Sequence, residues 1–254
     1  MPRRPIAVLV AAAGLGVVGC RSDAVELGFE PEPGATYHYR YEIEADVTRQ
    51  VEGEEPRTTH MQMTFESEQT VVEEADGGTL MEVTLTAEGA PPRTARVVID
   101  RAGSLEAFQQ VDGLPADEVG LPTGALLASA ATEPPDHPLS IGDDWEVDEG
   151  AVSGEGHLDR FAVLDGEPAA IVETTILEVL AETTERLGSA VGLDGDLRSV
   201  TTTAFDVGDG SVRRSLTDSE GTVDVVVSPP AEVQAAPVQA VVTYELEVTT
   251  TRLD

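Results

Sequence analysis

Cys20 is the residue whose position predicts a definite chemistry, because it is the only cysteine among 254 residues and closely follows an apolar run. The run covers residues 6–18, and Arg3 and Arg4 precede it. It is too short to cross a hydrocarbon core of about 30 Å, which needs about 20 residues. A charged start, a short apolar centre and a small residue near the end are typical of a secretory signal peptide. We therefore expect residues 1–19 to be a signal peptide.

The end of this segment, Val17-Val18-Gly19-Cys20, resembles the lipobox of bacterial lipoproteins. The resemblance implies that the Cys20 thiol carries two acyl chains such as palmitate and that Cys20 becomes the mature N-terminus. Two chains exceed what a single chain achieves in membrane attachment. The expected location is the cell membrane or outer envelope, facing the exterior or the periplasm. Three alternatives stay open: an ordinary signal peptide with a chance cysteine, a buried helix, and a twin-arginine signal at Arg3-Arg4.

The side chains that usually carry catalysis are sparse or scattered. All fifteen basic residues are arginine, so a Schiff base and a Ser-x-x-Lys nucleophile are excluded, and no Gly-x-Ser-x-Gly or phosphate-binding glycine loop occurs. No histidine has a second histidine or a cysteine at metal-ligand spacing. Acidic pairs such as Asp194-Gly195-Asp196 lack the EF-hand pattern. We expect no enzyme, no cofactor and no metal; a hydrolase without a readable motif is the remaining alternative. The histidines are His38, His60, His137 and His157.

Acidic residues dominate the charge, with 48 Asp and Glu against 15 Arg and a net charge of −33. Such a field repels phosphate, so we expect no nucleic-acid partner. Cleavage removes two of the arginines, which makes the mature charge −35. An anionic membrane surface would also repel the body of the protein. Residues 20–33 are rich in Glu, Gly and Pro and are expected to be a tether that reaches up to about 45 Å.

Apolar and polar residues alternate from Tyr37 onward, which predicts half-buried strands. The alternation puts aromatic and methionine side chains on one face of two successive runs. Such rings and thioethers make a broad, adaptable apolar surface. They could be an ordinary core face, or they could line a pocket for an acyl chain or another apolar ligand. The candidate ligand face consists of Tyr37, Tyr39, Tyr41, Met61, Met63 and Phe65.

Short connections rich in Asp and Gly separate the strands and predict antiparallel hairpins. Residues 122–131 lie between a proline and a proline pair and are predicted to form one short helix. Residues 173–187 suit a helix or a strand, and their threonines favour a strand. The expected fold class is mostly β, as a sandwich or half-barrel of long antiparallel strands. The predicted turns are 76–78, 100–103, 165–166, 209–210 and 218–221.

The mature chain also shows weak self-similarity. Gly34 precedes Tyr37 at a strand start as Gly142 precedes Trp145, an offset of 108 residues. The turn at 100–103 resembles that at 206–210, with an offset of about 106. Similar offsets suggest two tandem β-units, 34–113 and 141–254, joined by 114–140 within one domain over 34–254. A chance match of strand-turn sequences is the alternative.

The lipobox, the Leu139-to-Trp145 motif and the hairpin turns together resemble uncharacterised β-rich lipoproteins of high-GC bacteria. More remotely, the pattern is similar to the half-barrel lipid carriers, which are the lipoprotein-localisation chaperone and the mycobacterial lipid-carrier lipoproteins. That resemblance implies an apolar groove covered by helices. The expected function is a membrane-anchored, extracytoplasmic, non-enzymatic lipoprotein that binds a lipid or other apolar ligand. The alternative is a structural or adhesive module that acts through its acidic surface.

Replacing Cys20 by serine tests the lipobox directly. The Cys20→Ser chain lacks the thiol that would be acylated, so we expect it to move from the membrane fraction to the soluble fraction. Fractionation and intact-mass measurement of the wild-type and variant chains check this. A variant that stays in the membrane fraction would show that the lipoprotein interpretation is wrong.

Overall fold

Twelve antiparallel strands make up almost all of the fold in the computed structural model. The structure describes residues 24–253 except 77, 102, 104, 116–133, 136, 187–188, 231–232 and 234. The strands are β1 (Thr36–Val51), β2 (Arg57–Ala75), β3 (Gly78–Ala87), β4 (Arg93–Ile99), β5 (Leu105–Val111), β6 (Leu114–Pro115), β7 (Asp144–Glu149), β8 (Val152–Leu164), β9 (Glu167–Arg186), β10 (Ser189–Asp206), β11 (Val212–Ser228) and β12 (Val238–Arg252).

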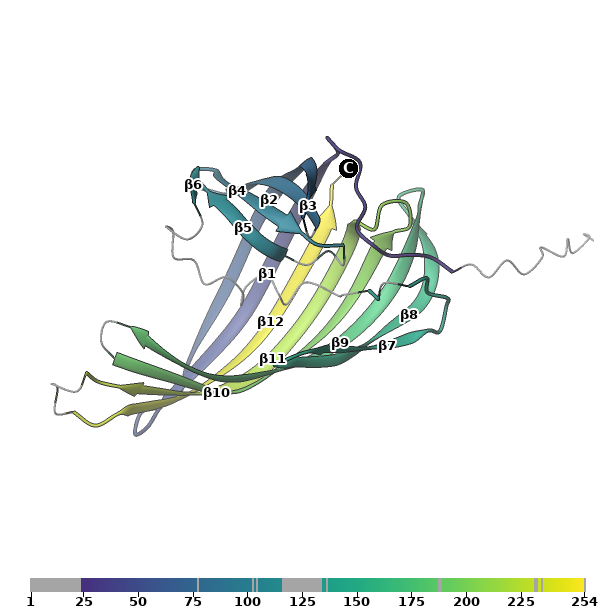
Figure 1. Cartoon of the computed structure of the whole chain (residues 1–254). Helices are drawn as coiled ribbons and strands as arrows, with labels where there is room; N and C mark the ends of the chain where they lie inside the picture. The colour runs from purple at the N-terminus through teal and green to yellow at the C-terminus, as the bar shows by residue number, and fades with distance from the viewer. Residues whose placement is uncertain are drawn as a thin grey trace, which may run out of the picture.

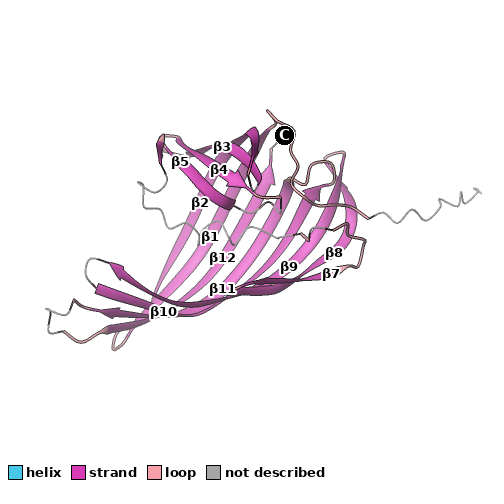
Figure 2. Ribbon diagram, viewed as in Figure 1, coloured by secondary structure: helices cyan, strands magenta, loops and turns pink. Residues whose placement is uncertain are grey.

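All twelve strands belong to one open sheet in the order β6-β5-β4-β3-β2-β1-β12-β11-β10-β9-β8-β7. Strands that are neighbours in the sheet are also consecutive in the chain, except at the centre. There β1 pairs with β12, from Tyr39↔Arg252 to Val51↔Ala240. The predicted mostly-β fold of long antiparallel strands is confirmed, with all of these strands in one open sheet. Residues 173–186 belong to β9, so the threonines of that stretch indicated the right structure. Figures 1 and 2 show the long strands β1, β12, β11, β10 and β9 side by side.

The sheet is strongly twisted and curved (Figure 1). Tyr37 and Tyr39 of β1 form a buried cluster with Val71, Met81 and Val97 of β2, β3 and β4. Leu105 of β5 and Val212 of β11 pack against this same cluster, although five strands separate β5 from β11 in the sheet. The sheet therefore curls upon itself. We call the face that carries the β1 tyrosines the inner face and the opposite face the outer face.

Small side chains fill the inner face where the curvature is strong. A Cβ added at Gly195 of β10 would lie 2.2 Å from the carbonyl oxygen of Thr222, and one at Gly221 would lie 2.6 Å from that of Asp196. Glycine inside a strand often marks a sharp bend where a second backbone approaches closely. These glycines let β10 and β11 bend together.

The glycine at 221 also explains a wrong prediction. The sequence predicts a hairpin turn at 218–221, but these residues lie inside β11. Gly221 is required there because a Cβ would lie 2.7 Å from the Tyr244 hydroxyl of β12, not because the chain reverses. Asp218 and Glu220 are exposed and Ser219 is buried, as strand alternation requires. The turn at 165–166 is confirmed, with φ of 53° at Asp165 and 94° at Gly166.

The described part of the predicted tether is packed against the sheet. Val25, Leu27 and Phe29 alternate with polar residues or glycine, and Leu27 is 2% exposed within a cluster that includes Trp145 and Leu139. Burying a leucine contributes about 1.5–3 kcal/mol. The segment crosses one end of the sheet (Figure 1). Residues 24–30 are thus packed where a free tether was predicted, because acidic and proline residues concealed the apolar alternation.

The described residues include no helix, and therefore none with the length and hydropathy to cross a bilayer. The predicted helix at 122–131 lies outside the described residues, as do the predicted signal peptide and Cys20.

Two glycines of β10 provide a matched test of the bend. We expect Gly195→Ala to lower the free energy of unfolding by about 1–3 kcal/mol, since its methyl group would collide with backbone of β11. Gly192→Ala has its nearest atoms at 3.9 Å and should be neutral or stabilising by up to about 1 kcal/mol. Urea unfolding of both variants measures the difference. Equal effects at the two positions would contradict the bend.

Candidate functional site

The candidate ligand face predicted from sequence is brought together on the inner face. In the β1–β2 register, Tyr41 lies opposite Phe65, Ile43 opposite Met63, and Ala45 opposite Met61. Ring centroids are 6.4 Å apart for Tyr37–Tyr39, 6.2 Å for Tyr39–Tyr41 and 4.6 Å for the stacked pair Tyr41–Phe65. The aromatic and methionine side chains thus follow one another along two neighbouring strands.

The aromatic end of this face is buried and the methionine end is exposed. Tyr37 is 2% exposed, Tyr41 and Phe65 are half-buried, and Met61 and Met63 are 42% and 52% exposed. One end of the predicted face is therefore core. The other end is an apolar surface that no described residue covers completely.

Burial raises the pKa of all three tyrosines of β1, and a different second contribution acts on each. Burial, followed by the hydrogen bond to Asp209, raises the pKa of Tyr37 well above its ordinary value. Burial also raises the pKa of Tyr39, to which the neighbouring Tyr41 adds. The pKa of Tyr41 is raised by burial although Ser67 and Gln69 hydrogen bonds oppose the shift. All three rings are thus neutral, and none is a phenolate nucleophile near neutral pH.

A band of buried hydroxyl groups continues the inner face across β10 and β11. Directly opposed pairs hydrogen-bond to each other at 2.8–3.2 Å. Thr174 of β9 extends the band, and its buried hydroxyl has no hydrogen-bond partner within the described ranges. Small hydroxyl side chains fit a curved surface, and mutual pairing removes most of their desolvation cost. The pairs are Ser199–Ser219, Thr201–Thr217 and Thr203–Ser215.

A cluster of charges closes one end of the inner face around the β10–β11 turn. The Tyr37 hydroxyl donates to Asp209 Oδ2 at 2.8 Å, and the Ser211 hydroxyl and amide donate to Asp209 Oδ1 at 2.6 and 2.9 Å. The Arg252 guanidinium donates to the Ser211 hydroxyl at 2.9 Å and lies 4.8 Å from the Tyr37 ring centroid. The backbone carbonyl of Asp209 accepts the Glu30 amide at 2.9 Å. Asp209 thus joins β1, β12 and the N-terminal segment.

Asp206 and Arg213 form an ion pair in this cluster, with side chains only 14% and 12% exposed. Arg252 lies 3.9 Å from the same Asp206 oxygen. For Asp209, burial acts to raise the pKa of its carboxyl, but the Ser211 and Tyr37 hydrogen bonds and the Arg252 charge outweigh it and lower the pKa below its ordinary value. The Asp209 carboxylate is thus ionised and hydrogen-bonded, which is a structural role rather than that of a proton donor.

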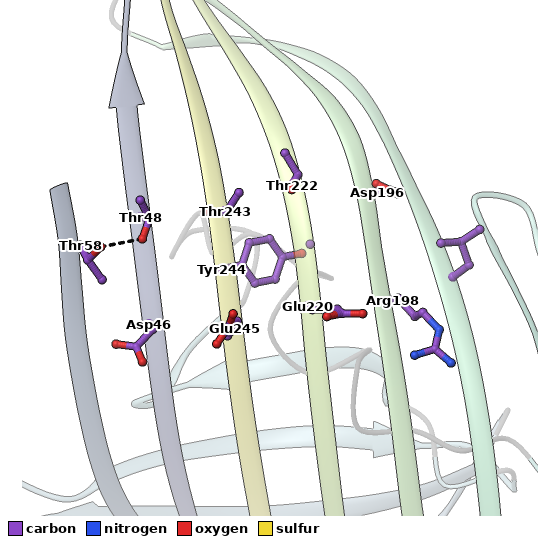
Figure 3. A pocket seen from close by; sticks show the side chains of 12 residues that line it. Asp46, Thr48, Thr58, Asp196, Arg198, Glu220, Thr222, Thr243, Tyr244 and Glu245 are labelled. Carbon is purple, nitrogen blue, oxygen red and sulfur yellow. Dashed lines mark hydrogen bonds between the residues drawn. The ribbon is translucent and has the colours of Figure 1, made fainter. Parts of the chain in front are cut away.

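The outer face carries a second feature, which we call the acidic grid. Six carboxylates occupy two adjacent rows across the three central strands β1, β12 and β11. Asp46 lies opposite Glu245, which lies opposite Glu220, and Arg198 of β10 follows in the same row. Figure 3 shows this row beside a row of threonines. The grid consists of Glu44, Asp46, Asp218, Glu220, Glu245 and Glu247.

An open groove of about 700 Å³ runs over part of the acidic grid (Figure 3). Asp46, Glu220, Glu245 and Arg198 line it, together with Tyr244. Burial, followed by the charges of Glu178 and Asp196, raises the pKa of this tyrosine. Carboxylates outnumber the single arginine among these lining residues, so the groove is a strongly anionic surface. This arrangement costs stability, because like charges directly opposite each other destabilise a sheet.

The described histidines do not converge. His38, His60 and His157 each face one carboxylate on the adjacent strand: Glu68 at 3.9 Å, Asp46 at 3.1 Å and Asp144 at 2.6 Å, respectively. Within the described part of the chain, no three His, Cys, Asp or Glu side chains are positioned to hold a metal ion.

Comparison with models of known protein families finds no match for this chain, and no curated protein matches it. The site must therefore be interpreted from its own geometry.

Sequence reasoning missed the hydroxyl band, the Asp209 cluster and the acidic grid. Alternating Ser and Thr in 199–203 and 215–219 marks the band, since these residues share a face. No local signal marks the cluster, because residues 37, 209 and 252 meet only once β1 pairs with β12.

Changing Asp209 to asparagine tests the cluster. We expect Asp209→Asn to lower the free energy of unfolding at pH 7 by about 1.5–3 kcal/mol, the usual contribution of hydrogen bonds to a charged group. The lowered pKa means that this stabilisation is complete above the ordinary aspartate value of about 3.9 and is lost as pH falls through the folded-state pKa. Wild-type and variant stabilities should thus converge in acid.

Denaturant unfolding at pH 7 and at pH 3 measures this convergence. The control is Asp165→Asn, an exposed turn position where the change should stay within about 0.5 kcal/mol. A difference between wild type and Asp209→Asn that is independent of pH would contradict the ionised, paired role of Asp209.

Proposed function

We propose that this chain is a membrane-anchored, extracytoplasmic, non-enzymatic lipoprotein that holds a lipid or other apolar ligand against the inner face of its curved sheet. The observation that carries the proposal is the exposure gradient of the aromatic and methionine face. Rings that begin in the core at Tyr37 continue without interruption to half-buried Tyr41 and Phe65 and to exposed Met61 and Met63. Exposed apolar patches of this kind commonly mark ligand or partner surfaces.

The chemistry of the inner face favours an apolar ligand over a polar one. Methionine and aromatic side chains adapt to an acyl chain without directional bonds. The hydroxyls of the neighbouring band bond mostly to each other, so few donors are left for a polar ligand.

The anchor in this proposal is the acylated Cys20. Only three residues separate Cys20 from Ala24, where the described chain begins and soon packs against the sheet. About 3.4 Å per residue over this stretch gives a reach of about 14 Å. The end of the sheet that carries the Asp209 cluster would then lie close to the membrane.

We also propose that the two halves are tandem units within this lipoprotein. The two sequence matches support this, since each connects a strand with the one six positions later. The strand start after Gly34 corresponds to β1 and that after Gly142 to β7, while the matched turns join β4 to β5 and β10 to β11. A half-barrel carrier built from two repeats is consistent with this arrangement.

The acidic grid favours one alternative, a structural or adhesive module that acts through its outer face. Its groove offers a concentrated negative surface without a metal-binding arrangement in the described ranges. A cationic polymer or protein surface would fit it by charge. This alternative needs no ligand on the inner face.

Native mass spectrometry of the detergent-extracted chain distinguishes the two. We expect the wild type to carry a co-purified lipid mass that Met63→Glu loses, because a carboxylate on the exposed end of the face cannot be desolvated cheaply by an acyl chain. Gln62→Glu makes the neighbouring residue acidic on the outer face and should retain the lipid. A wild-type chain without lipid, or equal retention by both variants, would contradict the carrier proposal.

A further inference from the structure

The first half of β2 is an open sheet edge. β2 pairs with β1 down to Arg49↔Arg57, but its pairing with β3 begins only at Phe65↔Ala87. The β3–β4 hairpin is too short to continue, because β3 ends at Ala87 and the chain reverses at Gly89, where φ is +76°. No described strand pairs with residues 57–64 on the side away from β1, and all eight residues are exposed.

This edge lacks the features that usually protect sheet edges. Natural edges are shortened, bulged, or blocked by proline and charged side chains, especially lysine. Residues 57–64 contain neither proline nor any carboxylate, their only permanent charge is Arg57, and the β1–β2 register runs through them without a bulge. Threonine and methionine dominate the segment, and its length of about 27 Å offers a long row of main-chain donors and acceptors.

We propose that residues 57–64 of β2 bind an extended segment of a partner protein by strand addition, and that this segment is apolar on one face and basic on the other. Main-chain hydrogen bonds supply affinity in this mode, and alternating side chains supply specificity. On the inner face, the added strand would lie beside Thr59, Met61 and Met63, of which the methionines accept apolar side chains.

The outer face determines the charge of the partner. An added strand would run beside His60 and Gln62, whose neighbours on β1 are Asp46 and Glu44 of the acidic grid. Two strand spacings, about 9–10 Å, separate the added backbone from these carboxylates. The long side chain of an arginine can span much of that distance toward an acidic neighbour. The grid therefore attracts a basic strand and steers its approach.

A second copy of this chain fits the edge less well. It would bring another formal charge of −33 and a second acidic grid to the same surface. The long-range field repels such a partner, whereas it attracts a cationic segment.

Hydrogen–deuterium exchange on the full chain in detergent tests the proposal. The probe is a capped octapeptide of alternating valine and arginine. We expect it to slow hydrogen exchange at least tenfold at those amides of 57–64 that point away from β1. We expect no comparable protection at the edge strands β6 and β7. The same peptide with every backbone amide N-methylated cannot pair through either edge and should give no protection, and one with glutamate in place of arginine should bind at least tenfold more weakly.

Two matched substitutions locate the site. Thr59→Lys introduces at the edge the residue that natural sheets use as protection, and we expect it to weaken peptide binding at least fivefold. Thr202→Lys makes the same change at an exposed position of the interior strand β10, outside the acidic grid, and should stay within twofold. Neither residue belongs to the candidate ligand face, so retention of co-purified lipid reports on the carrier proposal separately.

Three results would overturn the proposal. The first is equal protection by the N-methylated peptide, and the second is protection confined to residues outside 57–64. The third is concentration-dependent protection of 57–64 without any peptide, together with a dimeric mass, which would make a second copy the occupant.

Discussion

The structure of this protein depends on removing one face of a single wide sheet from water. Sheets normally bury an apolar face against a second layer. Here the sheet curls instead, until Leu105 and Val212, on strands far apart in its order, pack against the same buried cluster. Curvature in turn restricts composition, because side chains on the inner face converge. Glycine and paired hydroxyls fill the bent strands β10 and β11, while large rings and methionines occupy β1 and β2.

Curling leaves an end to be closed, and the N-terminal segment and the Asp209 cluster close it together. Buried charges are costly unless they are paired and hydrogen-bonded. Asp206 meets it with one guanidinium nitrogen of Arg213 and also pairs with Arg252, while Asp209 meets it with Ser211 and Tyr37. The same aspartate accepts the Glu30 amide, so the electrostatics of a turn and the path of the N-terminal segment are coupled. Such a junction fixes where any anchor at the N-terminus would hold the sheet.

Local pattern was sufficient to predict the elements but not their long-range neighbours. Alternation in residues 37–43 predicted β1 and its aromatic face, and threonine content indicated the strand at 173–186. The prediction of a turn at 218–221 was wrong because a glycine beside acidic residues occurs both in hairpin turns and inside bent strands. The packed segment at 24–30 was missed because composition outweighed its alternation. The Asp209 cluster and the acidic grid arise from pairing of β1 with β12, which no local spacing encodes.

The distribution of charge is the reverse of what sheet stability alone would favour. Like charges on directly opposite residues destabilise a sheet, and their Cβ atoms are about 5 Å apart, within the Debye length of about 8 Å at physiological salt. Central strands nevertheless carry the acidic grid, while the open half of β2 has no carboxylate at all. A solvated coat would need no such order, since acids at the edges would keep the chain soluble and also prevent unwanted strand pairing. Crowding the acids beside an unprotected edge stabilises neither the sheet nor the monomer, so the arrangement is better explained by selection for contact with a cationic, extended partner.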